Sequence, residues 1–392
     1  MYEFGQEELE AIGKVLEAGW LFRYGGEPMN LHQVEQFEQK LAERMQVPYA
    51  VAVTGGTTAL VCTLVGLGIG PGDEVIIPGY TFIATAAAVV DARAVPVIAE
   101  IDETLTIDVE DVRRKITPRT KAIIPVHMAG IPCNLEPILE VARERNLVVI
   151  EDACQAIGGA YKGQPLGSMG DAGAFSLNFY KIIGVGEGGA AITKDRTIYD
   201  RMRMHHDCGV SFWGENEAVD IPFIPGINYR MNEVLGAFAL VQLGRLDKFL
   251  AGMRPIKQRI YDTVAGPLTP APSNDLEGDC GTTLHFQFDT VETAVRFEAL
   301  LNERDLEAVR PINTGRHIYA NWEFIMNKTN VCAQWDVWGA PHYTGDVEYA
   351  PDMCPHTLDI LTRTVAIDTH PFWSETQVNT VIDHLFKAVK AL

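Results

Sequence analysis

The sequence predicts an α/β protein with a large domain on a mainly parallel, seven-stranded sheet and a smaller C-terminal α+β domain. In the first two-thirds of the chain, short apolar runs alternate with amphipathic segments. Strands that alternate with helices imply a parallel sheet covered on both faces. The pattern changes after about Arg245, so we expect the large domain over residues 1–245 and the smaller one over 246–392. A chain of 392 residues is long enough for both.

Seven apolar runs are the expected strands of the large sheet. Each is short and is separated from the next by a helical pattern or by turn residues. The expected strands cover residues 49–54, 74–78, 96–101, 121–127, 147–152, 173–177 and 189–193.

Capping residues and apolar spacing predict the helices between these strands. Apolar residues in the segment 135–142 follow the i, i+3, i+4, i+7 spacing of one helix face. Asp108 is typical of an N-cap before a helix that starts at Val109. An N-terminal helix ends at Gly19, a residue suited to the position after a helix, and the sequence leaves open which domain it packs against.

The smaller domain is predicted from two strands and two helices. The segments 282–288 and 363–369 have the composition of strands, and a helical segment starts at residue 291. Ser374 with Gln377 three residues later forms a capping box, which predicts a C-terminal helix.

Composition and charge exclude several classes of partner. The formal net charge is -20, so nonspecific binding to nucleic acid or to an anionic membrane is not expected. The seven cysteines are scattered and form no CxxC pair, which argues against a disulfide framework or a metal site and fits a reducing cytoplasm. The N-terminus lacks the pattern of a signal peptide, and no apolar run reaches the roughly 18 residues of a membrane span. We therefore expect a cytoplasmic protein.

The segment TGGTTAL, residues 54–60, predicts a phosphate-binding turn. It follows an expected strand and opens a helix, and glycines with free N–H groups at a helix start favour anions. Gly56, Thr57 and Thr58 lie in this turn. The alternative is a plain tight connection, and a P-loop is excluded because the GK[ST] ending is absent.

Two further segments carry ionisable side chains after apolar strands. In VVIEDACQA, Asp152 ends a strand, where it can hold a cationic ring nitrogen or simply cap a helix. In SLNFYKIIGVGEGGA, Lys181 lies among apolar residues that would favour imine formation, although a lone lysine is more often a surface residue. The GVGEGG run leads into a strand rather than a helix, which argues against a dinucleotide site.

The order of these three signals resembles the fold-type-I pyridoxal-phosphate enzymes, and more narrowly the DegT/DnrJ/EryC1/StrS sugar aminotransferases. The shared motifs are GGTTAL, PGYTFIAT, EDACQAIGG, the SxxxxK…GEGG block and GINYRMNE, residues 226–233. The chain departs from the family in having GGT for the usual SGT and SLN for the usual SF[HN]. Both changes retain the backbone donors and Ser176.

The resemblance implies roles for individual residues and pyridoxal 5'-phosphate as cofactor. Lys181 would be the Schiff-base lysine and proton shuttle, and Asp152 would pair with the pyridine nitrogen. The other implied cofactor contacts are Gly56, Thr57, Thr58, Phe82, Gln155, Ser176 and Asn228. Asn228 would reach the phosphate in a neighbouring subunit, which implies a homodimer with shared active sites.

Five residues are candidates for substrate contacts, and each has an ordinary alternative. Arg23, Arg230, His317 and Tyr319 could meet substrate oxygens or form ion pairs and packing contacts. His127 either lines the site or is a hydrogen-bonded core histidine. The run His205–His206–Asp207 is not expected to bind a metal, because adjacent histidines seldom converge on one ion.

The resemblance favours transfer of an amino group from glutamate or glutamine to a keto-sugar, sugar aldehyde or keto-cyclitol. The stretches GWLFRY, AEIDETL and VHMAG resemble the subgroup that makes 8-amino-3,8-dideoxy-manno-octulosonate, and aminoglycoside-type biosynthesis is the alternative. Two other readings stay open: a pyridoxamine-dependent sugar dehydratase, in which a histidine replaces the lysine, and a catalytically silent regulator. The presence of Lys181 argues against the dehydratase, and the presence of Lys181, Asp152 and Gln155 together argues against the silent regulator.

Overall fold

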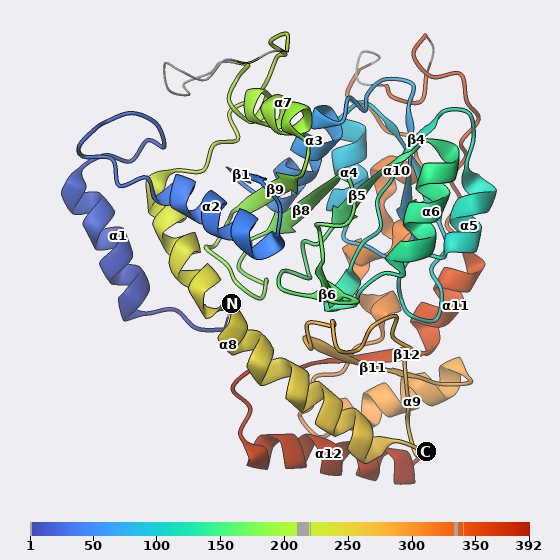
Figure 1. Ribbon diagram of the computed structural model, residues 1–392. Coiled ribbons are helices and arrows are strands. Elements are labelled where there is room, and N and C mark those ends of the chain that lie inside the picture. Colours follow the sequence, from blue (N-terminus) through green and yellow to red (C-terminus); the bar gives the residue numbers. More distant parts are fainter. Residues whose placement is uncertain (1, 210–218, 220, 333–335, 340) are drawn as a thin grey trace.

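A seven-stranded sheet forms the centre of the computed structural model, which describes residues 2–209, 219, 221–332, 336–339 and 341–392 (Figure 1). The strand order is β1-β9-β8-β5-β4-β2-β3. The strands are β1 Tyr49–Val53, β2 Glu74–Pro78, β3 Val95–Ala99, β4 Thr120–Ile123, β5 Val148–Asp152, β8 Ala172–Ser176 and β9 Gly189–Thr193. Only β9 runs antiparallel to its neighbours, β1 and β8. The predicted mainly parallel, seven-stranded sheet is confirmed.

Strand β4 is shorter than the sequence suggests. The prediction extends it to residue 127, whereas the strand ends at Ile123. Pro125 has no N–H to donate to a sheet, and beyond it Val126 forms only an isolated bridge with Asp152. The apolar run therefore continues past the strand as a turn that brings residues 126–131 alongside the end of β5.

Helices cover both faces of the sheet, as expected for a parallel arrangement. One face carries α2 Gln33–Met45, α5 Val109–Lys115 and α6 Leu135–Arg145. The other carries α3 Gly56–Gly66, α4 Ala84–Asp91 and α7 Arg196–His206. Successive residues of β1 alternate between the two cores, so that Ala52 packs in the first and Val53 in the second.

The predicted capping residues occupy the ends of their helices. The Asp108 side chain accepts a hydrogen bond from the Glu110 backbone N–H at 2.9 Å, just before α5. Helix α1, Gln6–Ala18, ends at Gly19, whose φ of 78° is a left-handed conformation that favours glycine. These helix boundaries therefore follow from local sequence.

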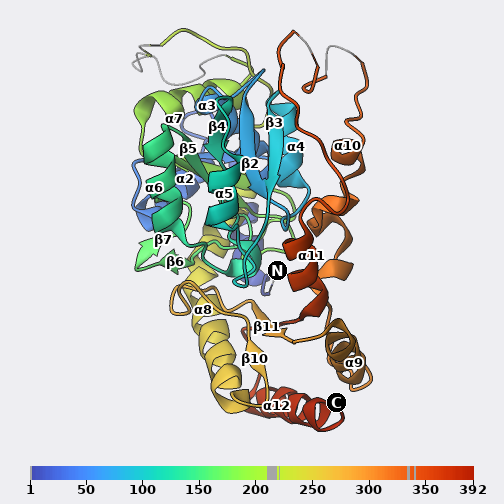
Figure 2. The same ribbon diagram turned by 90° about the vertical axis from the view of Figure 1, so that its right-hand side faces the viewer.

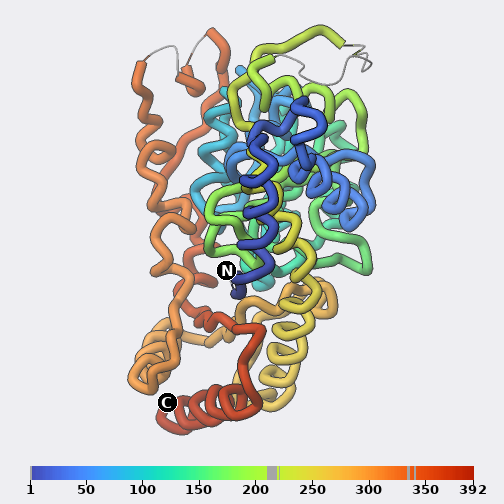
Figure 3. Tube along the Cα trace, turned by 90° about the vertical axis from the view of Figure 1, so that its left-hand side faces the viewer, coloured from blue at the N-terminus to red at the C-terminus, as the bar shows by residue number. Residues whose placement is uncertain are grey.

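Helix α1 packs along the long helix α8, Glu233–Val264, and the two lie side by side in Figure 3. Gln242 of α8 donates to the Glu8 carboxylate at 2.9 Å, and the Arg245 guanidinium lies 3.1 Å from the same group. Because α8 runs without interruption through residue 245, the predicted boundary at 245/246 falls inside a helix. The division of the chain into two domains stays a prediction.

The lower part of the molecule holds a separate small sheet and its own core (Figures 1 and 2). Its elements are β10 Thr269–Pro270, β11 Thr283–Gln287, β12 Thr364–Asp368, α9 Val291–Asn302 and α12 Glu375–Lys390. The sheet is antiparallel, and the last part of α8 packs beside α12. The predicted capping box is present, since Ser374 and Gln377 exchange hydrogen bonds at the start of α12.

One stretch of the C-terminal third returns to the large sheet. It contains η2 Pro311–Asn313, η3 Gly315–His317, η4 Tyr319–Asn321, α10 Glu323–Met326 and α11 Pro355–Arg363. Ile318 and Trp322 are buried in the core beside α3 and α4. Ile318 also bridges Tyr80, which follows β2. This contact brings η3 to the carboxyl end of the large sheet.

Three small elements complete the fold: η1 Met128–Gly130 and the hairpin of β6 Ala160–Tyr161 with β7 Gln164–Pro165. Across the part of the chain that the structure describes, no helix combines the length and apolar character that a bilayer crossing requires.

Candidate active site

A cavity of about 610 Å³ lies where β1, β5 and β8 end. This is the edge at which open α/β sheets bind ligands. Of the residues predicted for the site, eight line it: Gly56, Thr57, Phe82, Asp152, Gln155, Ser176, Lys181 and His317. Residues far apart in the sequence thus share one space with the size of a small-molecule site.

Asp152 is the last residue of β5 and is buried, with 4% of its surface exposed. Its two carboxylate oxygens accept separate hydrogen bonds, from the Thr85 hydroxyl at 2.8 Å and from the Cys154 backbone N–H at 3.1 Å. The Thr81 hydroxyl lies 2.7 Å from that of Thr85. This chain of hydroxyls fixes the orientation of the carboxylate before any ligand binds.

The start of α3 forms a cradle for an anion. Its N-cap is Gly55, which has no side chain to occupy the free N–H groups of the first turn. A Cβ added at Gly56 would lie 2.7 Å from Ser176 Cβ and 3.0 Å from Cys154 Sγ, so only glycine lets α3 approach β8 this closely. The N–H groups and the Ser176 hydroxyl therefore face the same end of the cavity.

The last glycine of the GEGG run is explained by the same close approach. A Cβ on Gly189, the first residue of β9, would lie 2.4 Å from the Gly55 carbonyl oxygen. A side chain there would push the turn before α3 away from the sheet. Gly189 thus supports the anion cradle through packing.

Lys181 and Gln155 complete the polar lining. Lys181 lies in the loop between β8 and β9, where its N–H donates to the Asn178 carbonyl at 3.0 Å. The Gln155 Oε1 accepts from the Ala129 N–H at 3.0 Å, which leaves its NH₂ group to donate toward a ligand. Burial chiefly, with the nearby Asp152 carboxylate, raises the pKa of the Cys154 thiol well above its usual value, so this cavity residue is a neutral thiol.

Phe82 and His317 form an aromatic wall. Their ring centroids are 5.3 Å apart, at an interplanar angle of 52°. Backbone hydrogen bonds join their segments, from Thr81 N–H to the His317 carbonyl at 3.0 Å and from Ile83 N–H to the Arg316 carbonyl at 2.9 Å. Burial first, and the Lys181 charge next, lower the pKa of His317, so its imidazole is neutral near pH 7.

Two predicted cofactor contacts do not line this cavity. Thr58 turns back on the helix start, and its hydroxyl donates to the Gly55 carbonyl at 2.8 Å. Asn228 is exposed, and its side-chain oxygen accepts from the Arg230 N–H at 3.2 Å. The expected contact of Asn228 with a neighbouring subunit stays a prediction.

Four of the five residues predicted to contact substrate do not line the cavity, because their side chains bind other residues of the chain. Arg23 binds Glu38, and Arg230 binds Asp207. The hydroxyl of Tyr319 donates to the Pro351 carbonyl at 2.8 Å, and its side chain is fully buried.

His127 is a core histidine, the second alternative that the sequence left open. It is fully buried, its Nε2 lies 3.1 Å from the Glu151 carboxylate, and its Nδ1 accepts from the Cys133 N–H at 3.1 Å. Glu151 also accepts three backbone N–H groups of residues 167–170. The His127–Glu151 pair therefore stabilises the loop of residues 167–170 and does not line the cavity.

Sequence reasoning missed several lining residues, chiefly Thr85 and Arg316. Both stand next to residues that were identified, since Thr85 follows Phe82 by three positions and Arg316 precedes His317. Sequence motifs identified the segments in which both residues lie. The importance of Thr85 is shown only by its hydrogen bond to Asp152, and that of Arg316 only by the pairing of η3 with residues 79–83.

Among the described residues, no cluster of histidine, cysteine, aspartate and glutamate is arranged to hold a metal.

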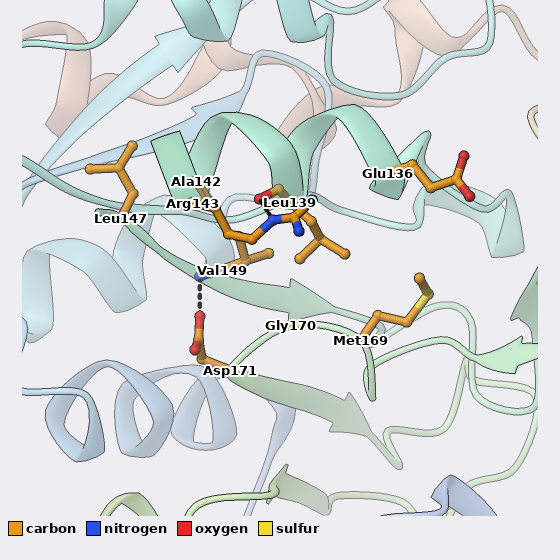
Figure 4. Close-up of a pocket in the computed structure, with 9 residues that line it drawn as sticks. All are labelled: Glu136, Leu139, Ala142, Arg143, Leu147, Val149, Met169, Gly170 and Asp171. Carbon is orange, nitrogen blue, oxygen red and sulfur yellow. Dashed lines mark hydrogen bonds between the residues drawn. The ribbon is translucent and has the colours of Figure 1, made fainter. Parts of the chain in front are cut away.

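A second hollow, of about 440 Å³, lies between α6 and the loop before β8 (Figure 4). Its lining is mainly aliphatic, and the dashed line between Val149 and Asp171 in Figure 4 marks the 2.8 Å hydrogen bond from the Val149 N–H to the Asp171 carboxylate. Val149 is near the start of β5, whereas Asp152 ends it. The hollow therefore lies at the opposite end of this strand from the cavity and contains none of the predicted site residues.

The donor set of the cavity fits pyridoxal phosphate. An anion cradle, a lysine, an aromatic ring and a preoriented carboxylate surround one space, and these are the groups that a phosphate, an aldehyde, a planar ring and a ring nitrogen require. Together with the mainly parallel sheet, they define a pyridoxal-phosphate-binding α/β enzyme of fold type I.

Comparisons with known proteins agree with this class. The model of the DegT/DnrJ/EryC1/StrS aminotransferase family matches residues 3–296. The chain therefore belongs to this family, whose members depend on pyridoxal phosphate.

Among curated relatives, the chain is 40% identical over 64% of its length to the GDP-perosamine synthase of Escherichia coli O157:H7 and 45% identical over 56% to that of Caulobacter vibrioides. These matches span 66% and 58% of the two relatives. It is 32% identical to the spore coat polysaccharide biosynthesis protein SpsC of Bacillus subtilis, over 98% of this chain and 95% of that one. Among solved structures, an aminotransferase from Psychrobacter cryohalolentis is similar with a TM-score of 0.83 and 26% identity, over 100% and 98% of the two chains.

Proposed function

We propose that the protein transfers an amino group from glutamate or glutamine to the carbonyl group of a keto-sugar, sugar aldehyde or keto-cyclitol in aminosugar biosynthesis. The observation that carries this proposal is the meeting of Lys181, Asp152 and the α3 cradle in one cavity. Bound pyridoxal phosphate supplies the electron-withdrawing ring that such a transfer needs. The chain supplies the groups that hold this ring and move the proton.

Each residue has a separate task in the proposed reaction. Lys181 Nζ would hold the cofactor and would then move a proton to and from the reacting carbon. Asp152 would keep the ring nitrogen protonated as an ion pair, in the orientation that Thr85 and the Cys154 N–H impose on the carboxylate. The N–H groups at the start of α3, with Ser176, would hold the phosphate. The Gln155 amide would donate to the oxygen on the ring.

For the acceptor, we favour a nucleotide-linked keto-sugar over the eight-carbon acid and the aminoglycoside precursors that motifs alone suggested. Two relatives that are 40% and 45% identical to this chain are named for GDP-perosamine, a nucleotide-linked amino sugar. SpsC, whose similarity spans 98% of this chain, is named for polysaccharide biosynthesis. A dehydratase or a silent regulator is disfavoured, because Lys181 lines the cavity together with Asp152.

Two measurements test the proposal. Borohydride reduction of the holoenzyme followed by peptide mapping should place the pyridoxyl group on Lys181, and label on another lysine would contradict the site. Candidate keto-sugars, keto-cyclitols and donors are then screened by mass spectrometry. An aminated product should appear, and the visible absorption of the cofactor should change when the donor alone is added. A protein that binds the cofactor but responds to no donor would be the silent regulator.

We also propose that the working unit is a homodimer with shared active sites, to which Asn228 contributes across the interface. Asn228 is exposed and does not line the cavity of its own chain. Its segment is nevertheless held rigidly, since Tyr229 N–H donates to the His206 carbonyl at 2.9 Å and Thr54 N–H donates to the Tyr229 carbonyl at 3.0 Å. Exposed apolar side chains on α1, Leu9 and Leu16, provide surface that a second copy could bury.

Subunit mixing tests the shared site. An Asn228→Ala and a Lys181→Ala variant are each expected to be defective alone. Refolded together, they should form heterodimers in which one site carries both defects and the other is intact, so that about half the activity per heterodimer returns. Heterodimers without recovered activity would place both residues in the same subunit's site. A cytoplasmic location stays a prediction from the sequence.

A further inference from the structure

The charged groups that line the cavity are not all used by the proposed function. Among the described residues, these groups are Asp152, Lys181, Glu187 and Arg316. Lys181 and Asp152 are assigned to the cofactor. Glu187 is an anion, and its carboxylate accepts from the Asn178 amide at 3.0 Å. Arg316 therefore remains as a cation in the lining without an assigned task.

The backbone of Arg316 is fixed at the edge of the cavity. Its carbonyl accepts two hydrogen bonds at 2.9 Å, from the Ile83 N–H and from the Trp322 indole N–H. On one side, Gly315 has a φ of 59° and accepts from the Asn321 amide at 2.9 Å. These bonds hold η3 against the segment that follows β2, so the starting point of the Arg316 side chain is well defined.

The Arg316 side chain is exposed, and within the described part of the chain no hydrogen bond or ion pair holds its guanidinium. Two other arginines show the contrasting, paired arrangement. Arg23 lies 2.8 Å from Glu38, and Arg310, on the same segment as Arg316, lies 2.8 Å from Glu298. Arg316 thus combines a fixed backbone with a charge that no described residue neutralises.

A planar guanidinium binds carboxylate or phosphate oxygens in a bidentate manner. We infer that Arg316 is the specificity residue that binds the anionic group of a substrate, and this inference rests on the proposed function. The anion is either a carboxylate of the amino donor or the diphosphate of a nucleotide-linked acceptor. Both offer anionic oxygens, and both would bind beside the wall of Phe82 and His317.

Binding of two inert probes separates these sources without requiring turnover. Glutarate represents the donor carboxylates and GDP represents the acceptor diphosphate. Each is titrated by calorimetry into the holoenzyme and into the holoenzymes of Arg316→Gln and Arg316→Lys. Arg113→Gln is the matched control, because it removes the same unit charge from a surface arginine on α5, paired with Glu144, outside the cavity.

We expect Arg316→Gln to weaken binding of one probe by about 10- to 100-fold, the range for a lost hydrogen bond to a charged group. Arg316→Lys should recover part of the affinity, and Arg113→Gln should leave it unchanged. Loss of glutarate binding assigns Arg316 to the donor, and loss of GDP binding assigns it to the acceptor. Equal binding to wild type and Arg316→Gln, or no binding of either probe to wild type, would overturn the inference.

The proposed function can fail separately from this inference. If probe binding depends on Arg316 but wild type aminates no carbonyl acceptor, the anion site stands and the transfer reaction is wrong. If wild type aminates an acceptor and Arg316→Gln binds both probes and turns over normally, the reaction stands and the role of Arg316 is wrong.

Discussion

Charged side chains gather in two regions of the molecule that differ in whether the charges are paired within the chain. The cavity holds Lys181, Asp152 and Arg316 at the carboxyl end of the sheet. The second region, here named the arginine cluster, lies beside α2 and the end of α7. It consists of Arg23, Glu38, His206, Asp207 and Arg230.

In the arginine cluster the charges neutralise one another. Arg23 donates to both oxygens of Glu38, at 2.9 and 2.8 Å, and also reaches His206 Nε2 at 3.2 Å. Burial first, and the Arg23 charge next, lower the pKa of His206 well below its ordinary value, so this imidazole is a neutral acceptor. In the cavity, by contrast, Lys181 and Arg316 have no anionic partner in the described chain. A charge paired inside the chain depends on its partner for stability, whereas a charge that faces a cavity is a candidate for a functional role.

The largest expected effect comes from Lys181. Lys181→Ala should lose at least about 10⁴-fold in turnover, because a positioned proton carrier contributes up to that factor even apart from its bond to the cofactor. Its thermal unfolding midpoint should match wild type. Steady-state kinetics and circular dichroism check both, and Lys194→Ala, an exposed lysine after β9, is the control. Substantial remaining turnover would contradict a catalytic role for the unpaired lysine of the cavity.

Asp152→Asn is expected to reduce turnover by about 10²- to 10³-fold, since a neutral amide cannot stabilise the cationic ring nitrogen. Cofactor retention should persist, because the α3 cradle is unchanged. Thr85→Val removes only one hydrogen bond from the carboxylate and should have a smaller effect. Single-turnover kinetics with the amino donor provide the measurement. Near-normal rates for Asp152→Asn would mean that another group serves the nitrogen.

For the arginine cluster, the expected effect is on stability. Arg23→Met should lower the free energy of unfolding by about 3–5 kcal/mol, because it leaves the largely covered Glu38 carboxylate without its cation. Arg23→Met combined with Glu38→Gln should recover part of this loss. Urea unfolding followed by fluorescence gives the comparison. If Arg23→Met is as stable as wild type, the cluster is not a structural unit.

The smallest effect concerns the protonation of His317. Its pKa is lowered, so the unfolded chain takes up this proton first as the pH falls, and the folded protein loses stability below about pH 6.5. In the cofactor-free protein, Lys181→Ala should raise the pKa of His317, because one of the two causes of its depression is removed. Nuclear magnetic resonance titration, with His317→Gln to assign the signal, measures the shift. An unchanged pKa of His317 would mean that the Lys181 charge is too far away to affect this imidazole.

The sequence by itself determined the positions of the seven strands of the large sheet, the helix ends that carry a capping residue, and the residues of the cofactor site that lie in recognisable motifs. These features depend on local patterns: apolar runs, caps, and polar residues at strand ends. Asp152, Lys181 and the Gly56 turn were identifiable because each lies at the end of a strand that the pattern predicts or within a few residues after it.

Only the tertiary structure decided which arginines and histidines face the cavity. Arg23 and Arg230 have the residue type of a substrate contact, but whether a guanidinium is paired depends on Glu38 and Asp207, which come together only in the fold. Arg316 reaches the cavity because η3 pairs with the segment after β2, more than two hundred residues earlier in the chain. Local sequence patterns cannot predict such long-range contacts. The same arginine can form an ion pair within the chain or face a ligand, depending on which residues the fold brings next to it.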